Sequence, residues 1–202
     1  YVQPNIALND KELDANFFQH EPYLNDFIKE HQDLKLKNAG GVHVEPMGIY
    51  SKKIQDLNEL ADGATVSIPN DPTNGGRALL LLQKANLLTL KEGTNEEATV
   101  QDIADNPKNL MIQEVEAAQL PRTLEDVDIS IINTNFALNA ELNPMNDALF
   151  IEDKDSPYVN IIAVRDGDES REDIQKLLTT IKSDKVKKFI EDKYKGAIVP
   201  AF

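Results

Sequence analysis

The chain has 202 residues, and its 35 acidic and 21 basic side chains give a formal net charge of −14. So acidic a chain is not expected to bind nucleic acid, because phosphate backbones attract basic surfaces. Hydrophobic residues make up 41% and charged residues 28%, which is typical of a globular protein and excludes a disordered one. The sequence contains no cysteine, so these residues form no disulfide, thiolate metal site or cysteine nucleophile.

No part of the sequence reads as a membrane span or a signal peptide. The longest apolar runs, such as 78–82 and 161–164, are far shorter than the ~18 residues that a bilayer span needs. The chain starts at Tyr1 and has neither a basic segment nor an apolar segment near its start. We therefore expect any targeting segment to have been removed or never included.

The first half of the chain predicts strands alternating with helices. Pro22 favours the start of a helix, Gly40-Gly41 is expected to interrupt the pattern, and Pro46 indicates an edge or crossing strand. The predicted elements are a short mixed segment at 7–13, a strand at 13–18, a helix at 22–31, an extended segment at 42–50, a helical turn at 57–60, a strand at 64–69 and a leucine-rich helix at 76–86.

The second half continues the alternation and ends in two helices, the last with Ser183 as its N-cap. Its predicted elements are a helical turn at 100–104, a strand at 110–115, a short helix at 121–126, a strand at 129–132, a helix at 136–140, strands at 147–151 and 158–164, and helices at 171–181 and 184–194. Strands alternating with helices through short connections predict an α/β fold with a mainly parallel sheet.

The segment 70–77, between a predicted strand and a predicted helix, is the sharpest candidate site. Exposed amides of Gly75 and Gly76 at a helix N-terminus could hold an anion, and Arg77 would add a guanidinium suited to a carboxylate. The glycine spacing fits neither a phosphate-binding loop nor a dinucleotide loop. The alternative, favoured by the local pattern alone, is an ordinary helix cap with a solvated Arg77.

Aromatic residues gather where the first strand meets the next helix. Phe17, Phe18, His20 and Tyr23 could form an apolar pocket with polar groups at its rim. In the alternative interpretation, Phe17 or Phe18 belongs to the core, His20 caps the helix and Tyr23 is half exposed.

Three asparagines are candidate binding residues. Asn133 and Asn135 follow a buried strand at the strand's carboxyl end, where open α/β sheets bind ligands, and Asn160 lies inside an apolar strand where its amide needs a partner. Each could bind the carboxylate or ammonium group of a ligand, or could simply fix a loop.

Catalysis is not indicated. The sequence has no Gly-x-Ser-x-Gly motif and no His-Glu-x-x-His motif, so we expect no enzyme and no cofactor. A metal site formed by His43 and Glu45 with His20 and His31 is a weaker alternative, because such spacing is common by chance.

Several motifs, taken together and in order, resemble one protein family. The motifs are Tyr1-Val2-Gln3-Pro4-Asn5, Leu13 to His20, Pro46 to Ser51, Ile68 to Ala78, Ile132 to Asn135, Ser156 to Asn160 and Lys195 to Ala201. They resemble the methionine-binding lipoproteins of the NlpA type, the extracytoplasmic receptors of methionine ABC importers. The resemblance covers essentially the whole chain.

The resemblance implies a two-lobed type II periplasmic-binding-protein fold that closes on an amino acid between its lobes. Arg77 would bind the α-carboxylate, and Asn133 or Asn135 with Asn160 would bind the head group. Tyr1, Phe18, His20 and Tyr23 would enclose the side chain, for which a thioether suits an aromatic slot. Implied partners are methionine or a methionine-containing dipeptide, the importer's permease and ATPase, and the membrane, through an N-terminal lipid anchor not in this sequence, at the cell surface or in the periplasm.

Two extended segments, 42–50 and 158–164, flank a self-contained run of strand–helix units and predict how the chain divides. Lobe one would comprise residues 1–48 and 157–202, and lobe two residues 49–156. In the family a strand, a helix and a further strand precede the Tyr1-Val2-Gln3-Pro4-Asn5 stretch, so this sequence is expected to lack the first βα unit of lobe one. An adhesin or immune-facing role is a further alternative, for which the sequence offers no feature.

Overall fold

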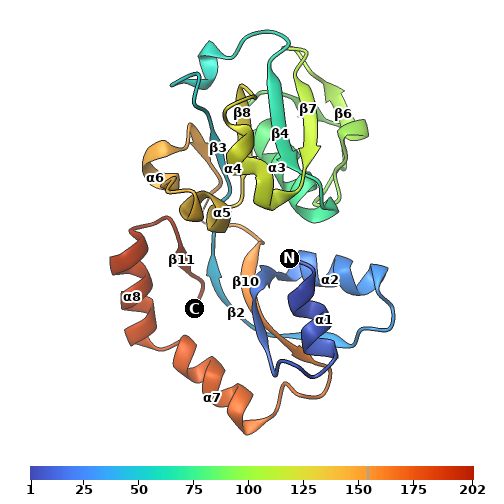
Figure 1. Cartoon of the computed structure of the whole chain (residues 1–202), viewed down its shortest axis with the longest axis vertical. Helices are drawn as coiled ribbons and strands as arrows, with labels where there is room; N and C mark the ends of the chain where they lie inside the picture. Colours follow the sequence, from blue (N-terminus) through green and yellow to red (C-terminus); the bar gives the residue numbers. More distant parts are fainter. Residues whose placement is uncertain (154) are drawn as a thin grey trace. The chain divides into compact units, whose positions relative to one another are not determined.

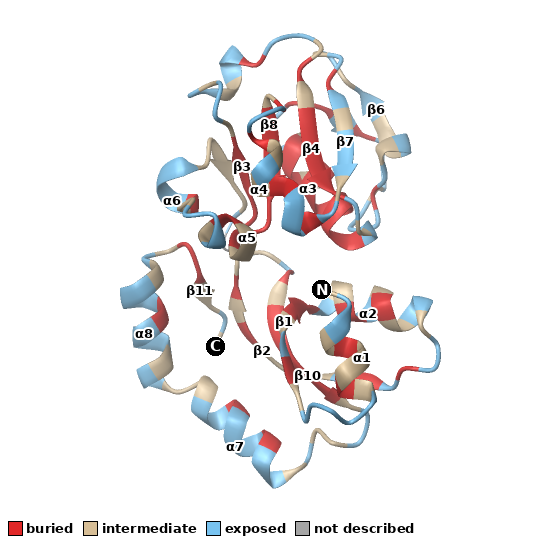
Figure 2. Cartoon of the chain, in the orientation of Figure 1, coloured by how far each residue is buried: buried red, intermediate tan, exposed pale blue. Residues whose placement is uncertain are grey.

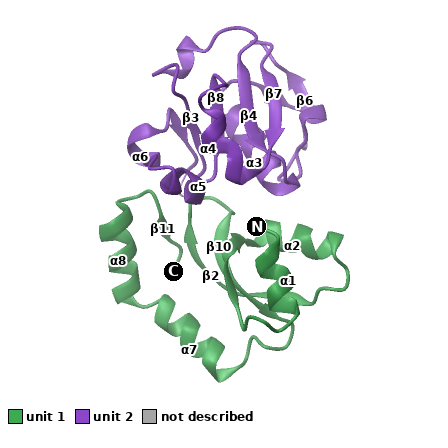
Figure 3. Ribbon diagram, in the orientation of Figure 1, with its two compact units in different colours: residues 1–45, 154–202 green, residues 46–153 purple. Residues whose placement is uncertain are grey.

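A computed structural model describes residues 1–153 and 155–202. The chain divides into two compact units (Figure 3). Unit 1 comprises Tyr1–Glu45 and Lys154–Phe202, and unit 2 comprises Pro46–Asp153. Both units combine sheets and helices, so the predicted α/β class is confirmed.

Unit 1 is built on a sheet whose strands lie in the order β1-β10-β2-β11 (Figure 1). Each neighbouring pair is antiparallel. The elements of this unit are α1 (Gln3–Asn9), β1 (Asn16–His20), α2 (Glu21–Glu30), β2 (Leu36–Val44), β10 (Val159–Arg165), α7 (Glu172–Ile181), α8 (Asp184–Tyr194) and β11 (Val199–Pro200). Ser183 caps α8 as predicted, because its side chain accepts a hydrogen bond from the Val186 amide.

The middle of strand β10, residues 161–164, is apolar because helices cover both faces of this sheet. Its alternate residues point to opposite faces: Ile161 and Ala163 pack with residues of α1 and α2, whereas Ile162 and Val164 pack with Ile174 of α7. Figure 2 shows the resulting buried band along β10.

Gly40-Gly41 does not interrupt the pattern as predicted but lies inside β2. A Cβ atom on Gly41 would lie 2.8 Å from Cγ1 of Val159, and the pairing of β2 with β10 shifts register nearby, between Asn160 and Ile161. Glycine inside a strand marks such close approaches and irregularities.

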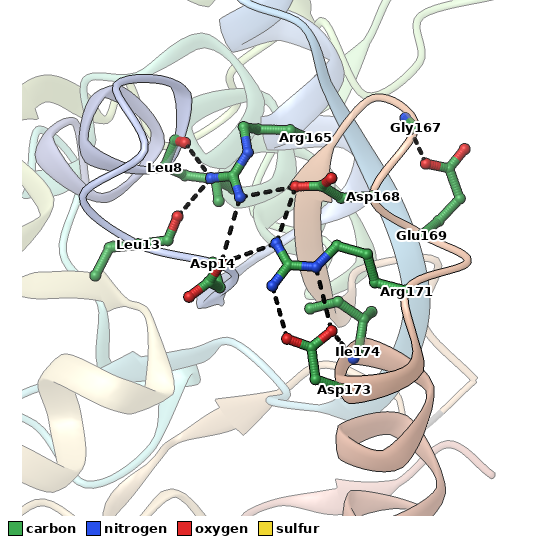
Figure 4. Close-up of polar contacts among 10 residues, drawn as sticks. All are labelled: Leu8, Leu13, Asp14, Arg165, Gly167, Asp168, Glu169, Arg171, Asp173 and Ile174. Atoms are coloured by element: carbon green, nitrogen blue, oxygen red, sulfur yellow. Dashed lines mark hydrogen bonds and ion pairs between the residues drawn. The ribbon is translucent and has the colours of Figure 1, made fainter.

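An ion-pair network in unit 1 fixes the connection between α1 and β1 (Figure 4). Nη1 of Arg165 donates to the carbonyl oxygens of Leu8, at 2.9 Å, and Leu13, at 2.5 Å. Arg165 and Arg171 both contact Asp14 and Asp168. A guanidinium, with several donors in a rigid plane, suits this bridging role.

Unit 2 is built on a sheet with strand order β7-β4-β8-β3-β9. Its strands are β3 (Gly48–Tyr50), β4 (Thr65–Pro69), β7 (Met111–Val115), β8 (Ile129–Ile132) and β9 (Phe150–Ile151), with a separate pair formed by β5 (Thr89–Leu90) and β6 (Ile103–Asp105). Its helices are α3 (Pro72–Lys84), α4 (Leu120–Thr123), α5 (Thr134–Asn139), α6 (Pro144–Asp147) and the short 3-10 helices η1 (Leu57–Glu59), η2 (Val100–Asp102) and η3 (Ala117–Gln119).

The prediction of a mainly parallel sheet is wrong. Strand β4 is parallel to β7 and β8, but β3 is antiparallel to both β8 and β9, and unit 1 has the antiparallel pairs described above. Local sequence patterns predict strands but not their direction, which depends on how the connections run.

Helix α3 starts at Pro72, four residues before the predicted start at 76. Asp71 caps it, since its side chain accepts a hydrogen bond from the Asn74 amide, and Pro72 occupies the first helical position. Its apolar residues Leu79 and Leu82 pack in a core with β4 and β8. Gly76 lies inside the helix, and its position requires glycine because a Cβ there would meet the Glu96 carbonyl oxygen at 2.2 Å.

The predicted strand at 147–151 is also corrected. Its first residue belongs to helix α6, which Pro144 opens and Asn143 caps by accepting a hydrogen bond from the Met145 amide. Only Phe150–Ile151 forms strand β9. Within the described residues, no helix is both long and apolar enough to cross a membrane.

Candidate functional site

In unit 2, polar residues gather at one edge of the sheet. Parallel strands β4 and β8 end at this edge; Asn133 follows β8 directly, and Asp71 is the second residue after β4. Because β3 runs antiparallel to β8, its first residue, Gly48, pairs with the last residue of β8, and β9 ends there as well. The topology therefore brings Arg77 of α3, Asn133 and Glu152 to the same edge.

Arg77 is buried, with 3% of its surface exposed, and it pairs with Glu152. Its Nε donates to Oε1 at 3.1 Å and its Nη2 to Oε2 at 2.5 Å. The Met47 amide also donates to Oε2 of Glu152 at 3.3 Å. The solvated Arg77 of the helix-cap interpretation is therefore wrong, because a fixed, buried guanidinium occupies this position.

The glycine amides do not form the expected anion site. The amide of Gly75 donates to the Asp71 carbonyl oxygen at 2.8 Å, as helix α3 requires. Both positions of the helix require glycine, because neighbouring backbone leaves no room for a side chain: a Cβ on Gly75 would meet the Pro69 carbonyl oxygen at 2.9 Å.

Asp71, Asn74 and Asn133 form a chain of side-chain hydrogen bonds. Nδ2 of Asn74 donates to Oδ1 of Asp71 at 2.9 Å, and Nδ2 of Asn133 donates to Oδ1 of Asn74 at 2.8 Å. Oδ1 of Asn133 is buried and has no hydrogen-bond partner among the described residues. Asn135 lies two residues further on, half-buried in the first turn of α5.

In unit 1, the pairing of β10 with β1 and β2 places three candidate residues in one row across the sheet. Two were predicted ligand-binding residues, and His43 belonged to the alternative metal site. Asn160 of β10 pairs with His20 of β1 on one side and with His43 of β2 on the other. His20 also caps α2, since its Nδ1 accepts a hydrogen bond from the Tyr23 amide at 3.1 Å. The neutral ring then carries its proton on Nε2.

The four predicted aromatic residues of unit 1 do lie together. The ring of Tyr1 is 6.0 Å from that of Phe18 and 5.7 Å from that of Tyr23, and the ring of Tyr23 is 6.2 Å from that of His20. Phe17 is not part of the core, because it is exposed and packs edge-on against His43 at 5.1 Å. The edge-to-face geometry is the favourable one for aromatic pairs.

A buried amide cluster supports this aromatic group. Asn5 and Gln19 bond each other through both amide groups, at 2.9 and 2.7 Å, and Nδ2 of Asn16 donates to Oδ1 of Asn5 at 2.9 Å. This satisfied network ties α1, which follows Tyr1, to β1, which carries Phe18.

The metal alternative is not favoured. His43 Nε2 contacts Oε1 of Glu45 at 2.8 Å, but the ring of His20 packs edge-on against Tyr158 and Nδ1 of His31 lies by the Phe27 carbonyl oxygen. Across residues 1–153 and 155–202, no group of three or more His, Cys, Asp or Glu side chains is placed to hold a metal ion.

Comparison with known proteins decides the family. The model of the NlpA lipoprotein family matches residues 1–202. This chain belongs to the NlpA lipoprotein family. Substrate-binding lipoproteins are not a class of enzyme, and the resemblance drawn from the sequence motifs is confirmed.

Two relatives of similar sequence are named as lipoproteins, and the name of the second includes D-methionine binding. Lipoprotein 28 of Escherichia coli O157:H7 is 49% identical over 201 residues, which are 98% of this chain and 74% of that protein. The D-methionine-binding lipoprotein MetQ of Escherichia coli strain K12 is 47% identical, with the same coverage.

Solved structures of the family share the fold. A nutrient-binding protein from Burkholderia cenocepacia, bound to methionine, has a TM-score of 0.96 and 49% identity, covering 100% of this chain and 85% of that one. A periplasmic substrate-binding protein of an ABC transporter from Coxiella burnetii has a TM-score of 0.95 and 46% identity, covering 100% of this chain and 84% of that one.

The motifs alone did not reveal all residues of the candidate site. Glu152, the partner of Arg77, lies 75 positions away in the sequence and carries no local signal. Tyr158 was part of a predicted strand, yet its ring lies 5.0 Å from that of His20. The Asp71-x-x-Asn74 spacing did carry a signal, since it is that of a helix N-cap and its third helical residue.

Proposed function

We propose that this chain is the substrate-binding protein of an ABC importer and that it binds methionine. The observation that carries the proposal is a buried guanidinium, Arg77, at the same sheet edge as a buried amide oxygen, Oδ1 of Asn133. A guanidinium suits the α-carboxylate of an amino acid, and an amide oxygen suits its α-ammonium group. The methionine-bound relative from Burkholderia cenocepacia supports the same ligand.

The head group is assigned to unit 2. Glu152 fixes the plane of the Arg77 guanidinium through Nε and Nη2, and we assign the ligand carboxylate to this oriented group. Asn133 and Asn135 would bind the ammonium group or the second carboxylate oxygen. Asn160 of unit 1, which lies in a row with His20 and His43, is a further proposed head-group contact.

The thioether side chain is assigned to the aromatic residues of unit 1: Tyr1, Phe18, His20 and Tyr23. Their edge-on packing offers ring faces and edges to a polarisable sulfur, and each sulfur–aromatic contact is worth roughly 0.3–1.5 kcal/mol. Tyr158, which contacts His20, joins this set.

We further propose that the two units are the lobes of the binding protein, and that the permease and ATPase of the importer are its partners. The lipoprotein names of the relatives support a place outside the cytoplasm. A lipid anchor on cysteine would lie outside residues 1–202, which contain none.

Isothermal titration of the purified protein tests the proposal, after refolding to remove any retained ligand. L-methionine, D-methionine, a methionine-containing dipeptide and leucine form the ligand panel. Saturable binding of free methionine, with leucine weaker, supports the proposal. Binding of the dipeptide alone would assign the dipeptide as the substrate, and no binding of any methionine compound would refute the proposal.

A further inference from the structure

Oδ1 of Asn133 is an unusual atom for a protein interior. Asn133 is 6% exposed and occupies the N-cap position of α5, yet its side chain does not cap that helix. An asparagine at an N-cap normally accepts a hydrogen bond from the first turn with this oxygen. Here the oxygen has no partner among the described residues, and a buried acceptor left in this way requires an explanation.

The explanation begins with Asp71. Its Oδ1 receives three donors, namely the Asn74 amide at 3.0 Å, Nδ2 of Asn74 at 2.9 Å and the Thr73 hydroxyl at 3.2 Å. An ionised carboxylate can only accept hydrogen bonds. Asp71 therefore requires the NH2 group of Asn74, and not its oxygen, to face it.

The orientation of Asn74 determines that of Asn133. With its NH2 group turned to Asp71, Asn74 presents Oδ1 to Asn133, and only the NH2 group of Asn133 can donate to it. The oxygen of Asn133 is then the atom left for other partners. The parallel strands β4 and β8 bring the two asparagines together, because Asn133 directly follows β8 and Asn74 lies in the first turn of α3, the helix that follows β4.

We propose that Asp71 and Asn74 are positioning residues that fix the amide orientation of Asn133, so that Asn133 presents an acceptor to the ligand. This proposal rests on the proposed function for the nature of the ligand. Asn74 and Arg77 are three residues apart on α3 and so share one face of the helix. The acceptor at the same sheet edge as Arg77 would select a donor-only α-ammonium group over a substituent that cannot donate.

The orientation itself can be tested without ligand, by unfolding the protein in urea. Asn133→Asp replaces the donor that faces Asn74 by an acceptor-only carboxylate, which Asn74 cannot meet while Asp71 holds its NH2 group. The substitution should lower the folding equilibrium constant strongly. In an Asp71→Ala background Asn74 can turn, so the effect should be at least about tenfold smaller, which is 1.4 kcal/mol of coupling.

Asp71→Asn separates orientation from charge. The three donors that converge on Oδ1 of residue 71 would keep the oxygen of an asparagine in the same place, so Asn133→Asp should remain as damaging in this background. Simple repulsion between two carboxylates would instead be relieved by Asp71→Asn. Asp71→Gly replaces Asp71→Ala if the latter does not fold, since glycine is accepted at an N-cap.

A second experiment reads the ligand preference of the same variants. L-methionine and its 2-hydroxy analogue, whose hydroxyl can donate or accept, are titrated into each folded protein. The ratio of their affinities should fall about tenfold or more in Asp71→Ala and stay near that of the unaltered protein in Asp71→Asn. Additive unfolding energies in the first experiment, or relief by Asp71→Asn, would overturn the proposal. Failure of the unaltered protein to bind methionine would refute the proposed function and leave the unfolding test valid.

Discussion

Arg77 and Glu152 form a two-point ion pair, with Nε to Oε1 at 3.1 Å and Nη2 to Oε2 at 2.5 Å. The side chains of Arg77 and Glu152 are 4% and 14% exposed, so few water molecules compete with these hydrogen bonds. The pair orients the guanidinium that we assign to the ligand carboxylate, and it links helix α3 to the segment that follows β9.

Glu152→Gln should therefore destabilise the protein. Removal of one charge from a buried pair leaves the other without a counter-charge, and we expect a loss of roughly 3–5 kcal/mol in the free energy of unfolding. Urea denaturation measures it. The matched control is Glu125→Gln, whose partner Lys52 forms an exposed pair that should contribute about 0–1 kcal/mol. Equal losses in the two variants would contradict the structural role of Glu152.

His20→Asn should weaken methionine binding while leaving helix α2 intact. Asparagine is as good an N-cap as any residue, so the bond from the Tyr23 amide can be kept, but the ring beside Tyr23 and Tyr158 is lost. Loss of one sulfur–aromatic contact predicts an affinity about 2- to 10-fold lower by calorimetry. Norleucine, which lacks the sulfur, should lose less, and an unchanged methionine affinity would remove His20 from the site.

Stability should depend on pH through Asp128. Hydrogen bonds from the amide and then the hydroxyl of Thr65, followed by Lys53, hold the pKa of Asp128 below its usual value. A carboxyl whose pKa is lower in the folded protein stabilises the fold at pH values above about 3.9, the pKa of the same group in the unfolded chain. This stabilisation is lost as the pH falls through the pKa of the folded state. Unfolding of the unaltered protein and of Asp128→Asn should therefore differ at pH 7 and converge toward pH 3. A difference that stays constant with pH would contradict this assignment.

Gly76→Ala should disrupt unit 2. The new Cβ would lie 2.2 Å from the Glu96 carbonyl oxygen and 3.0 Å from the Ala98 amide nitrogen, both of them backbone atoms. Overpacking of this kind costs about 1–3 kcal/mol or more. Gly40→Ala is the comparison, because its closest contact is the flexible end of Lys182 at 2.9 Å. Thermal unfolding should show a large drop for the first variant and a small one for the second, and similar values would argue against close packing at Gly76.

Much of the fold could be predicted from local patterns. The alternation of strands and helices, Ser183 as an N-cap and the gathering of Phe18, His20 and Tyr23 all depend on neighbours in the sequence. Tyr1 was indicated only by the family resemblance. Strand direction could not be predicted, because it depends on the path of the whole chain. The glycines of α3 and β2 led to wrong predictions of a helix start and of a break in the pattern. Glycine occupies these positions because other backbone or side-chain atoms of the fold leave no room for a Cβ.

The candidate site shows the same limit. Arg77 and Asn133 could be found because each follows a strand, but the amide orientation of Asn133 depends on Asn74 and Asp71 through contacts that no motif records. Glu152 likewise could not be recognised as a site residue from the sequence, because only the pairing of β9 with β3 brings it to this edge of the sheet.

The central claim, that Arg77 binds the carboxylate of an amino acid, is tested most directly by calorimetric titration of methionine into the unaltered protein, Arg77→Ala and Arg77→Lys. The double variant Arg77→Ala with Glu152→Gln removes both charges of the buried pair and controls for an unpaired Glu152, and circular dichroism checks that each variant is folded. We expect Arg77→Ala to lose about 2–5 kcal/mol of binding free energy, the double variant to lose a similar amount, and Arg77→Lys to recover only part, because an ammonium group lacks the planar pair of donors. Equal affinities in all four proteins would contradict the claim and remove Arg77 from the binding site.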